Sequence, residues 1–201
     1  MTGIIDYGRG NLHSVEKALG RLGHAARIVS GGAEMARCAR LILPGVGAFP
    51  DAMAALSGRA RDIRAAVADG VPLLGICLGM QLLFEHSDEC GGADGLGLLP
   101  GRVERFPAGL IVPHMGWSPL GDARGALFEG VGPMDAYFVH SFFCPLGDFT
   151  AARATHAAPD GSRPVEFSAA VQRGRLFGTQ FHPEKSGRRG LMLIDNFARL
   201  G

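Results

Sequence analysis

The segment LLGICLGMQLLFE, residues 73–85, decides the fold because a single cysteine between two glycines joins one apolar run to another. We expect a strand over residues 71–76 and a helix over residues 78–85, with Cys77 at the tight turn between them. The flanking glycines relieve steric crowding around such a turn. The pattern is typical of a nucleophile elbow, with sulfur replacing the serine oxygen of Gly-x-Ser-x-Gly.

The predicted elbow makes Cys77 a candidate nucleophile. Ligands of open α/β sheets bind beyond the carboxyl ends of the strands, where this sulfur would project. A helix N-terminus and cationic neighbours can bring a cysteine pKa to about 3.5–7.5, from about 8.5 in a free thiol. The alternative is that Cys77 simply fills a strand end as a small apolar residue. Cys38, Cys90 and Cys144 lack paired glycines, and we expect them to be structural.

The first half of the chain alternates short apolar runs with helical periodicity. The strand-like runs are GIIDY, ARIV, LILP and VPLLGI, and the first two are separated by apolar residues at helical spacing from Leu12 to Leu22. Helix starts are marked by Asn11, by Pro50-Asp51 and by Asp62. This βαβ rhythm predicts an α/β fold of three layers, in which helices flank an open, mainly parallel, mixed sheet.

After Phe84 the chain becomes rich in glycine, with shorter expected strands over residues 136–143 and 165–171. VQRGRLFGTQF is typical of a hairpin with Arg173-Gly174 at its turn. A closing amphipathic helix carries apolar residues from Leu191 to Leu200. Because no linker interrupts the sequence, we expect one domain over residues 1–201.

Composition excludes some classes of partner. A formal net charge of +1 offers no basic field for nucleic acid. No run approaches the roughly 18 apolar residues that span a bilayer, and the N-terminus lacks the pattern of a signal peptide, so we expect a cytoplasmic protein without membrane contact. The four cysteines and seven histidines show no metal-ligand spacing, and we expect no metal.

The segment GTQFHPEKS, residues 178–186, supplies the groups that a cysteine nucleophile needs. His182 and Glu184 are two residues apart on an extended segment, so base and orienting carboxylate can point to the same side. Pro183 restricts the backbone between them. Taken alone, a histidine at a strand end is more often structural than catalytic, but its combination with the elbow favours catalysis.

An oxyanion site is expected in LILPGVGAF, residues 41–49. The small residues after this strand let backbone N–H groups face a ligand, and the amide of Leu78 would supply a second donor. The alternative is a plain strand-to-helix turn. Gln81, one helical turn beyond Cys77, lies on the same helix face and is a candidate ligand contact, with a solvated glutamine as the alternative.

Three of these motifs resemble those of the class I (triad) glutamine amidotransferases, namely LPGVGAF, GICLGMQLLFE and QFHPEKS. IIDYGRGNLHSVEKALGRLG, VPHMGWS and YFVHSF also resemble the glutaminase subunits of imidazole glycerol phosphate synthases. The resemblance implies the flavodoxin-like fold of that family and a triad of Cys77, His182 and Glu184. It implies hydrolysis of glutamine through a γ-glutamyl thioester, without a cofactor.

The resemblance also implies a partner and further site residues. The ammonia would pass to a separate (β/α)8 cyclase subunit, forming a heterodimer that makes imidazole glycerol phosphate in histidine biosynthesis. Three groups of residues would serve the site: the oxyanion strand Gly45, Val46 and Gly47, of which Val46 gives its amide; the substrate contacts Gln81, Ser141 and Phe142; and the interface or ammonia exit, with Asn11, Ser14, Met115, Trp117, Tyr137 and Lys185.

The sequence departs from the family pattern at three places. Ser118 replaces an asparagine, Phe142 replaces a tyrosine, and the loop within residues 154–167 is altered. Trp117 could be a core residue, but its glycine, serine and proline neighbours favour a loop that serves an interface. The alternatives left open are a glutaminase of another synthase, of the pyridoxal phosphate or aminobenzoate type, a general thiol hydrolase, and a catalytically silent binding subunit.

Overall fold

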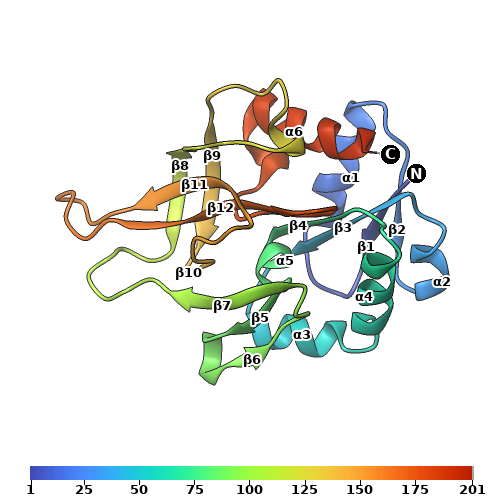
Figure 1. Ribbon diagram of the computed structural model, residues 1–201, viewed down its shortest axis with the longest axis horizontal. Coiled ribbons are helices and arrows are strands. Elements are labelled where there is room, and N and C mark those ends of the chain that lie inside the picture. Colours follow the sequence, from blue (N-terminus) through green and yellow to red (C-terminus); the bar gives the residue numbers. More distant parts are fainter. Residues whose placement is uncertain (201) are drawn as a thin grey trace.

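A seven-stranded sheet forms the centre of the computed structural model, which describes residues 1–200 (Figure 1). Its order is β11-β12-β13-β4-β3-β1-β2. The strands are β1 (Thr2–Ile5), β2 (Ala26–Val29), β3 (Arg40–Gly45), β4 (Leu73–Cys77), β11 (Thr150–His156), β12 (Val165–Arg173) and β13 (Leu176–Thr179). The five strands from β13 to β2 pair in parallel, whereas β11, β12 and β13 pair antiparallel. The predicted mixed, mainly parallel sheet is therefore confirmed.

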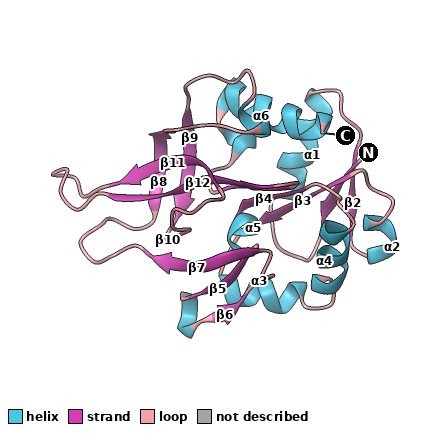
Figure 2. Ribbon diagram, in the orientation of Figure 1, coloured by secondary structure: helices cyan, strands magenta, loops and turns pink. Residues whose placement is uncertain are grey.

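Helices cover both faces of this sheet, as predicted (Figure 2). They are α1 (Leu12–Arg21), α2 (Gly32–Met35), α3 (Phe49–Leu56), α4 (Ala60–Ala68), α5 (Leu78–Gln81) and α6 (Gly187–Arg199). Successive side chains of a strand point to opposite faces. Ile4 of β1 accordingly packs in the cluster that contains α1 and α6, and Ile5 packs in the cluster of α2, α3 and α4.

Two smaller sheets flank the carboxyl edge of the central one (Figure 1). The first consists of β5 (Phe84–Ser87), β6 (Ala93–Asp94), β7 (Leu99–Arg105) and β10 (Phe142–Phe143), and the second pairs β8 (His114–Pro119) with β9 (Asp135–His140). Short 3-10 helices cover Glu89–Gly91, Ala126–Phe128 and Pro183–Lys185. Much of the pocket described below comes from these additions.

Capping and turn chemistry explain where the predicted elements begin. The side chain of Asn11 accepts a hydrogen bond from the amide of Ser14 at 3.3 Å and so caps α1, as expected from its position. Pro50 lies in the first turn of α3, where its missing N–H costs no intrahelical bond. The closing helix is also present, as α6.

Several predicted boundaries are wrong. The helix expected over residues 78–85 ends at Gln81, because the next residues enter β5, whose backbone pairs with β6 and β7. The strand expected over residues 136–143 is divided between β9 and β10. The hairpin after β12 exists, but its turn lies at residues 174–175 because Arg173 still pairs with Leu176. Within residues 1–200, no helix is long and apolar enough to cross a membrane.

Candidate active site

The ends of three neighbouring parallel strands bring the candidate residues together. Gly45 ends β3 and pairs with Cys77, which ends β4. On the other side of β4, strand β13 ends at Thr179, and the chain then runs to His182. Segments that are 32 and 105 residues from Cys77 in the sequence therefore meet at one edge, where open α/β sheets bind ligands.

Cys77 occupies the strained turn that the sequence predicts. Its backbone has φ 55° and ψ −114°, a left-handed φ that is uncommon for residues other than glycine. A Cβ on Gly79 would lie 1.8 Å from the carbonyl oxygen of Leu43, and one on Gly75 would lie 2.5 Å from the oxygen of Gly79. Both glycines are thus required by close backbone packing, and the elbow geometry is confirmed.

The His182 and Glu184 side chains form a buried pair beside this thiol. His182 Nδ1 lies 2.8 Å from Glu184 Oε1, and the two side chains are 5% and 2% exposed. Burial alone would lower the pKa of His182, but hydrogen bonds to Cys77 and Glu184 and their negative charges outweigh it and raise the pKa to about 9. The imidazole is therefore protonated at neutral pH and can stabilise a thiolate next to it.

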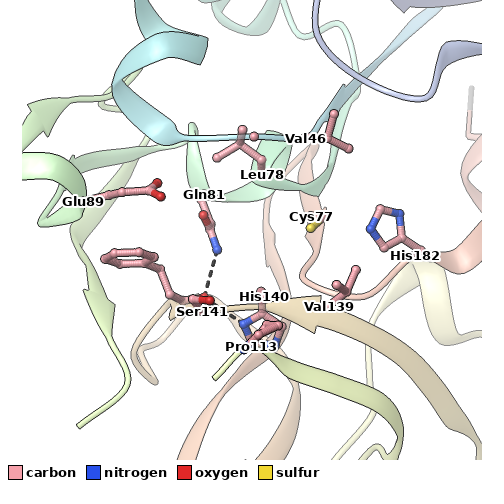
Figure 3. Close-up of a pocket in the computed structure, with 12 residues that line it drawn as sticks. Val46, Cys77, Leu78, Gln81, Glu89, Pro113, Val139, His140, Ser141 and His182 are labelled. Carbon is pink, nitrogen blue, oxygen red and sulfur yellow. Dashed lines mark hydrogen bonds between the residues drawn. The ribbon is translucent and has the colours of Figure 1, made fainter. Parts of the chain in front are cut away.

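A pocket of about 350 Å³ opens beside the sulfur (Figure 3). It is lined by Val46, Gly47, Cys77, Leu78, Gln81, Glu89, Pro113, Val139, His140, Ser141, Phe142 and His182. The structure thus brings together the predicted nucleophile, the base, the oxyanion segment and all three predicted substrate contacts. Gly45 lies just behind this wall, as the buried last residue of β3.

The amide of Gln81 is held in one orientation. Its Nε2 donates to the Phe142 carbonyl at 3.0 Å and to Gln180 Oε1 at 2.9 Å, so both amide hydrogens are used. The side-chain oxygen of Gln81 is left for a ligand. Gln180 in turn points its Nε2 toward the Cys77 sulfur, 3.9 Å away. Gln180, which is fully buried, was not among the predicted site residues. The available signal was a glutamine within the apolar run LFGTQF, two residues before His182.

The pocket also contains a carboxylate that the sequence analysis missed. Glu89 lies on the wall beyond Gln81 (Figure 3), and its Oε2 accepts a hydrogen bond from the amide of Phe49 at 2.7 Å. That amide belongs to the first residue of α3, so the helix end holds the carboxylate in place. Glu89 comes from the irregular glycine-rich segment after the elbow, where no periodicity indicates which side chains face inward.

The predicted interface residues lie outside the pocket. Met115 and Trp117 are 62% and 58% exposed on β8, and the Trp117 ring lies 6.1 Å from that of Tyr137 on β9. Trp117 is therefore on a strand and not in the expected loop, although it is exposed as expected. Ser118 turns inward instead, with its hydroxyl 2.9 Å from His114 Nε2.

The remaining predicted residues surround the His182 segment. Tyr137 accepts at its carbonyl from the His182 amide, at 3.0 Å, and its own amide donates to the Ser186 hydroxyl. Lys185 lies between His182 and Ser186 in the sequence, and it is exposed. Asn11 lines a narrow cavity of about 10 Å³ together with Val46, His182 and Glu184, and Ser14 follows within the first turn of α1. Within residues 1–200, no cluster of three or more His, Cys, Asp or Glu could hold a metal ion.

The motifs and the geometry agree with the family whose profile matches nearly the whole chain. The profile described as Glutamine amidotransferase class-I matches residues 3–200. The chain belongs to this family. Within it, the chain is 52% identical over 202 residues to the imidazole glycerol phosphate synthase subunit HisH of Moorella thermoacetica, covering 98% of this chain and 93% of the relative. The HisH subunit of Methanothermobacter thermautotrophicus is 43% identical, with 100% and 98% covered.

Solved structures agree with the fold of this amidotransferase. A structure described as a crystal structure of glutamine amidotransferase matches with a TM-score of 0.74 at 23% identity, covering 99% of each chain. The structure of PurLQS from Thermotoga maritima matches with the same TM-score of 0.74 at 20% identity, covering 98% of this chain and 96% of the other. This chain, with its central mixed sheet, therefore has the fold of the class I amidotransferases.

Proposed function

We propose that this chain is the glutaminase subunit of an imidazole glycerol phosphate synthase, and that Cys77, His182 and Glu184 are its triad. It hydrolyses glutamine to glutamate and ammonia and passes the ammonia to a (β/α)8 cyclase subunit in the cytoplasm. One observation carries the catalytic part: a strained cysteine faces a buried imidazole–carboxylate pair in a pocket large enough for an amino acid. We propose that residues 1–201 form one domain.

The reaction follows from the arrangement of these groups. The Cys77 thiolate adds to the side-chain carbonyl carbon of glutamine, and the carbonyl oxygen becomes an oxyanion. The backbone amides of Val46 and Leu78, both on the pocket wall, are the proposed donors to it. His182 gives its proton to the amide nitrogen, the carbon–nitrogen bond breaks, and ammonia leaves a γ-glutamyl thioester. Water, deprotonated by His182, then adds to the thioester and releases glutamate and the thiolate.

Glu89 gives this pocket its selectivity for an amino acid. Glutamine carries an α-ammonium group, and the Glu89 carboxylate is on the wall beyond Gln81, away from the sulfur. Ser141 and the free oxygen of Gln81 offer further polar contacts on the same wall. The side-chain amide of the substrate can then reach Cys77 while its charged end stays near Glu89.

Replacing Glu89 by glutamine is expected to raise KM for glutamine by about 10- to 100-fold, since a charge-assisted hydrogen bond contributes about 1.5–3 kcal/mol. The turnover number should change far less, because Glu89 is distant from the reacting carbon. Steady-state glutamate release over a range of glutamine concentrations measures both. Glu85→Gln, an exposed carboxylate on β5, is the matched control, and a fall in kcat without a change in KM would contradict this assignment.

The exposed face of β8 is the proposed cyclase-docking surface. Met115 and Trp117 project from it as large exposed side chains, next to Tyr137. The small cavity beside Asn11, His182 and Glu184 is the size of one water molecule and therefore of one ammonia molecule. This cavity is the proposed exit for ammonia, and it lies between the triad and the start of α1.

Replacing Trp117 by alanine is expected to weaken cyclase binding by about 2 kcal/mol or more, because tryptophan is enriched among residues that dominate binding energy. Stability should be little affected, since the ring is 58% exposed. Isothermal titration with the cyclase measures the affinity, and a melting curve checks the fold. Leu146→Ala, at another exposed hydrophobic residue, is the control. Unchanged affinity would remove β8 from the interface.

We also propose that the isolated subunit has low activity and that the segment of residues 44–47 is its switch. Gly47 has φ +99°, so its peptide groups can adopt orientations that a larger residue resists. Beside Gly45 lies the hydroxyl of Tyr7, which is buried and has no hydrogen-bond partner within the described chain. A buried unpaired hydroxyl favours any rearrangement that brings it a partner.

The deciding experiment measures glutamate release by the chain alone, with the cyclase, and with the cyclase and its ligand. We expect low activity alone and strong stimulation in the full mixture, with ammonia transferred into the cyclase product. Activity that another synthase stimulates and the cyclase does not would favour a glutaminase of a different pathway. Failure of Cys77 to react with a glutamine-mimicking electrophile in the complex would favour a silent binding subunit.

A further inference from the structure

A chain of buried hydrogen bonds connects strand β8 to the glutamine pocket. Ser118 Oγ lies 2.9 Å from His114 Nε2, and His114 Nδ1 lies 3.3 Å from His140 Nε2. His140 Nδ1 then lies 2.7 Å from the Phe142 carbonyl oxygen. Both histidines are buried, and neither has a role in the mechanism above.

The Phe142 carbonyl oxygen, at the end of this series of hydrogen bonds, fixes the direction of every bond in it. A carbonyl oxygen only accepts, so His140 Nδ1 carries the hydrogen. In a neutral ring, His140 Nε2 is then an acceptor, and His114 Nδ1 must be the donor. By the same reasoning His114 Nε2 accepts, and the Ser118 hydroxyl donates. Burial lowers the pKa of His114 to about 4 and that of His140 to about 3, so both rings are neutral at pH 7.

Aromatic packing holds the two imidazoles in these orientations. The His114 ring stacks on His156 at 4.4 Å and on Phe138 at 5.0 Å. The His140 ring lies 5.2 Å from Phe167 and 5.4 Å from Phe106. Neither ring can rotate without disturbing this cluster. A displacement of Ser118 is therefore transmitted through the two imidazoles to the Phe142 carbonyl.

The Phe142 carbonyl joins this chain to the substrate contacts. Its oxygen accepts from both His140 Nδ1 and Gln81 Nε2, and this pair of bonds uses both of its lone pairs. Gln81 Nε2 also donates to Gln180, whose own Nε2 faces Cys77. The orientation of the Gln81 oxygen in the pocket thus depends on where the Phe142 carbonyl is held.

The two faces of β8 therefore carry two different kinds of residue. Met115 and Trp117 are exposed on the outer face, which is the proposed docking surface. His114 and Ser118 alternate with them along the strand and belong to the inner face, where the hydrogen-bond chain begins. A partner that shifts β8 on docking would move Ser118 and His114 together with it.

We propose that Ser118, His114 and His140 are positioning residues that orient the Phe142 carbonyl and Gln81 for glutamine binding and link this orientation to docking on β8. The inference rests on the proposed function, since it assumes that glutamine is the substrate and that β8 contacts the cyclase. Coupling between two sites is reciprocal. Glutamine must therefore change the affinity for the cyclase by the same factor by which the cyclase changes the affinity for glutamine.

Ser118→Ala removes the first donor at a partly buried position outside the aromatic cluster, so the cluster stays in place. In the assembled complex it is expected to raise KM for glutamine by about three- to tenfold, the loss of one net hydrogen bond, with kcat within about twofold. On a Cys77→Ala background, the difference in cyclase affinity with and without saturating glutamine should shrink. Ser118→Thr retains a hydroxyl and should restore both values.

Two controls separate this inference from a purely structural role. Ser57→Ala removes a hydroxyl that bonds only Ala54 within its own helix end, and KM should stay at its wild-type value. Nitrogen-15 spectra of the imidazoles should show both His114 and His140 neutral and protonated at Nδ1. A ring protonated at Nε2, or an unchanged KM in Ser118→Ala, would overturn the inference. Absence of glutaminase activity in the wild-type complex would instead overturn the proposed function.

Discussion

Replacing Cys77 by alanine is expected to reduce glutamine hydrolysis by the cyclase complex by at least about 10⁴-fold, because the thioester route then has no nucleophile. The substitution removes one sulfur from a backbone turn that the neighbouring glycines hold in place. The fold should therefore survive. Release of glutamate from glutamine, followed with a coupled dehydrogenase assay, measures the loss.

Two measurements make this result specific. The Cys77→Ala complex should still form imidazole glycerol phosphate from added ammonia, because the cyclase chemistry does not use the thiol. Cys38→Ala is the matched control: Cys38 is also buried, but burial raises the pKa of its thiol, and the residue packs beside Gly3 of β1 and does not line the pocket. Full glutaminase activity in Cys77→Ala would eliminate the proposed nucleophile.

The parts of the site that the sequence predicted are those set by local backbone chemistry. The elbow at Cys77 requires glycine on both sides, and the spacing of His182 and Glu184 is fixed by two peptide bonds and a proline. The mainly parallel pairing of the sheet then follows from the alternation of strands and helices. Because carboxyl ends of parallel strands meet at one edge, these local features were enough to predict that Cys77, His182 and Glu184 lie in one crevice.

The parts that the sequence did not predict depend on contacts between distant segments. Gln180 and Glu89 reach the pocket only because β13 and the segment after β5 fold against the elbow. The helix predicted as far as residue 85 stops at Gln81, since the buried run that follows fits a strand as well as a helix and the pairing of β5 with β7 decides between them. Pairing of this kind leaves no signal within a short window of sequence.

In the proposed reaction the leaving ammonia takes its proton from His182, and Glu184 is buried beside this imidazole. Burial is the largest influence on His182 and lowers its pKa, yet the pKa is raised to about 9 by Cys77 and Glu184 together. Without the Glu184 carboxylate, only Cys77 would oppose the lowering of the His182 pKa by burial. The charge of Glu184 therefore favours the protonated form of His182 that the proposed reaction needs, and its hydrogen bond to Nδ1 holds the orientation of the ring.

Glu184→Gln retains the shape of the side chain and removes its charge, and kcat is expected to fall by about 10²- to 10⁴-fold. The wild-type rate should be present below about pH 9 and be lost as the pH rises through that value, because His182 then loses the proton that the ammonia needs. In the variant the pKa of His182 falls, so the alkaline limb moves to lower pH. Profiles of kcat/KM from about pH 6 to pH 10 measure both effects.

The control for Glu184→Gln is a carboxylate that lies outside the pocket. Glu166→Gln removes the charge of an exposed residue on β12 that pairs with Arg153 across 4.0 Å, and its profile should match the wild type. If the alkaline limb of Glu184→Gln stayed where the wild type has it, Glu184 would not control the protonation of His182. If the limb moved while kcat was preserved, the proton on His182 would not be the one that the departing ammonia takes.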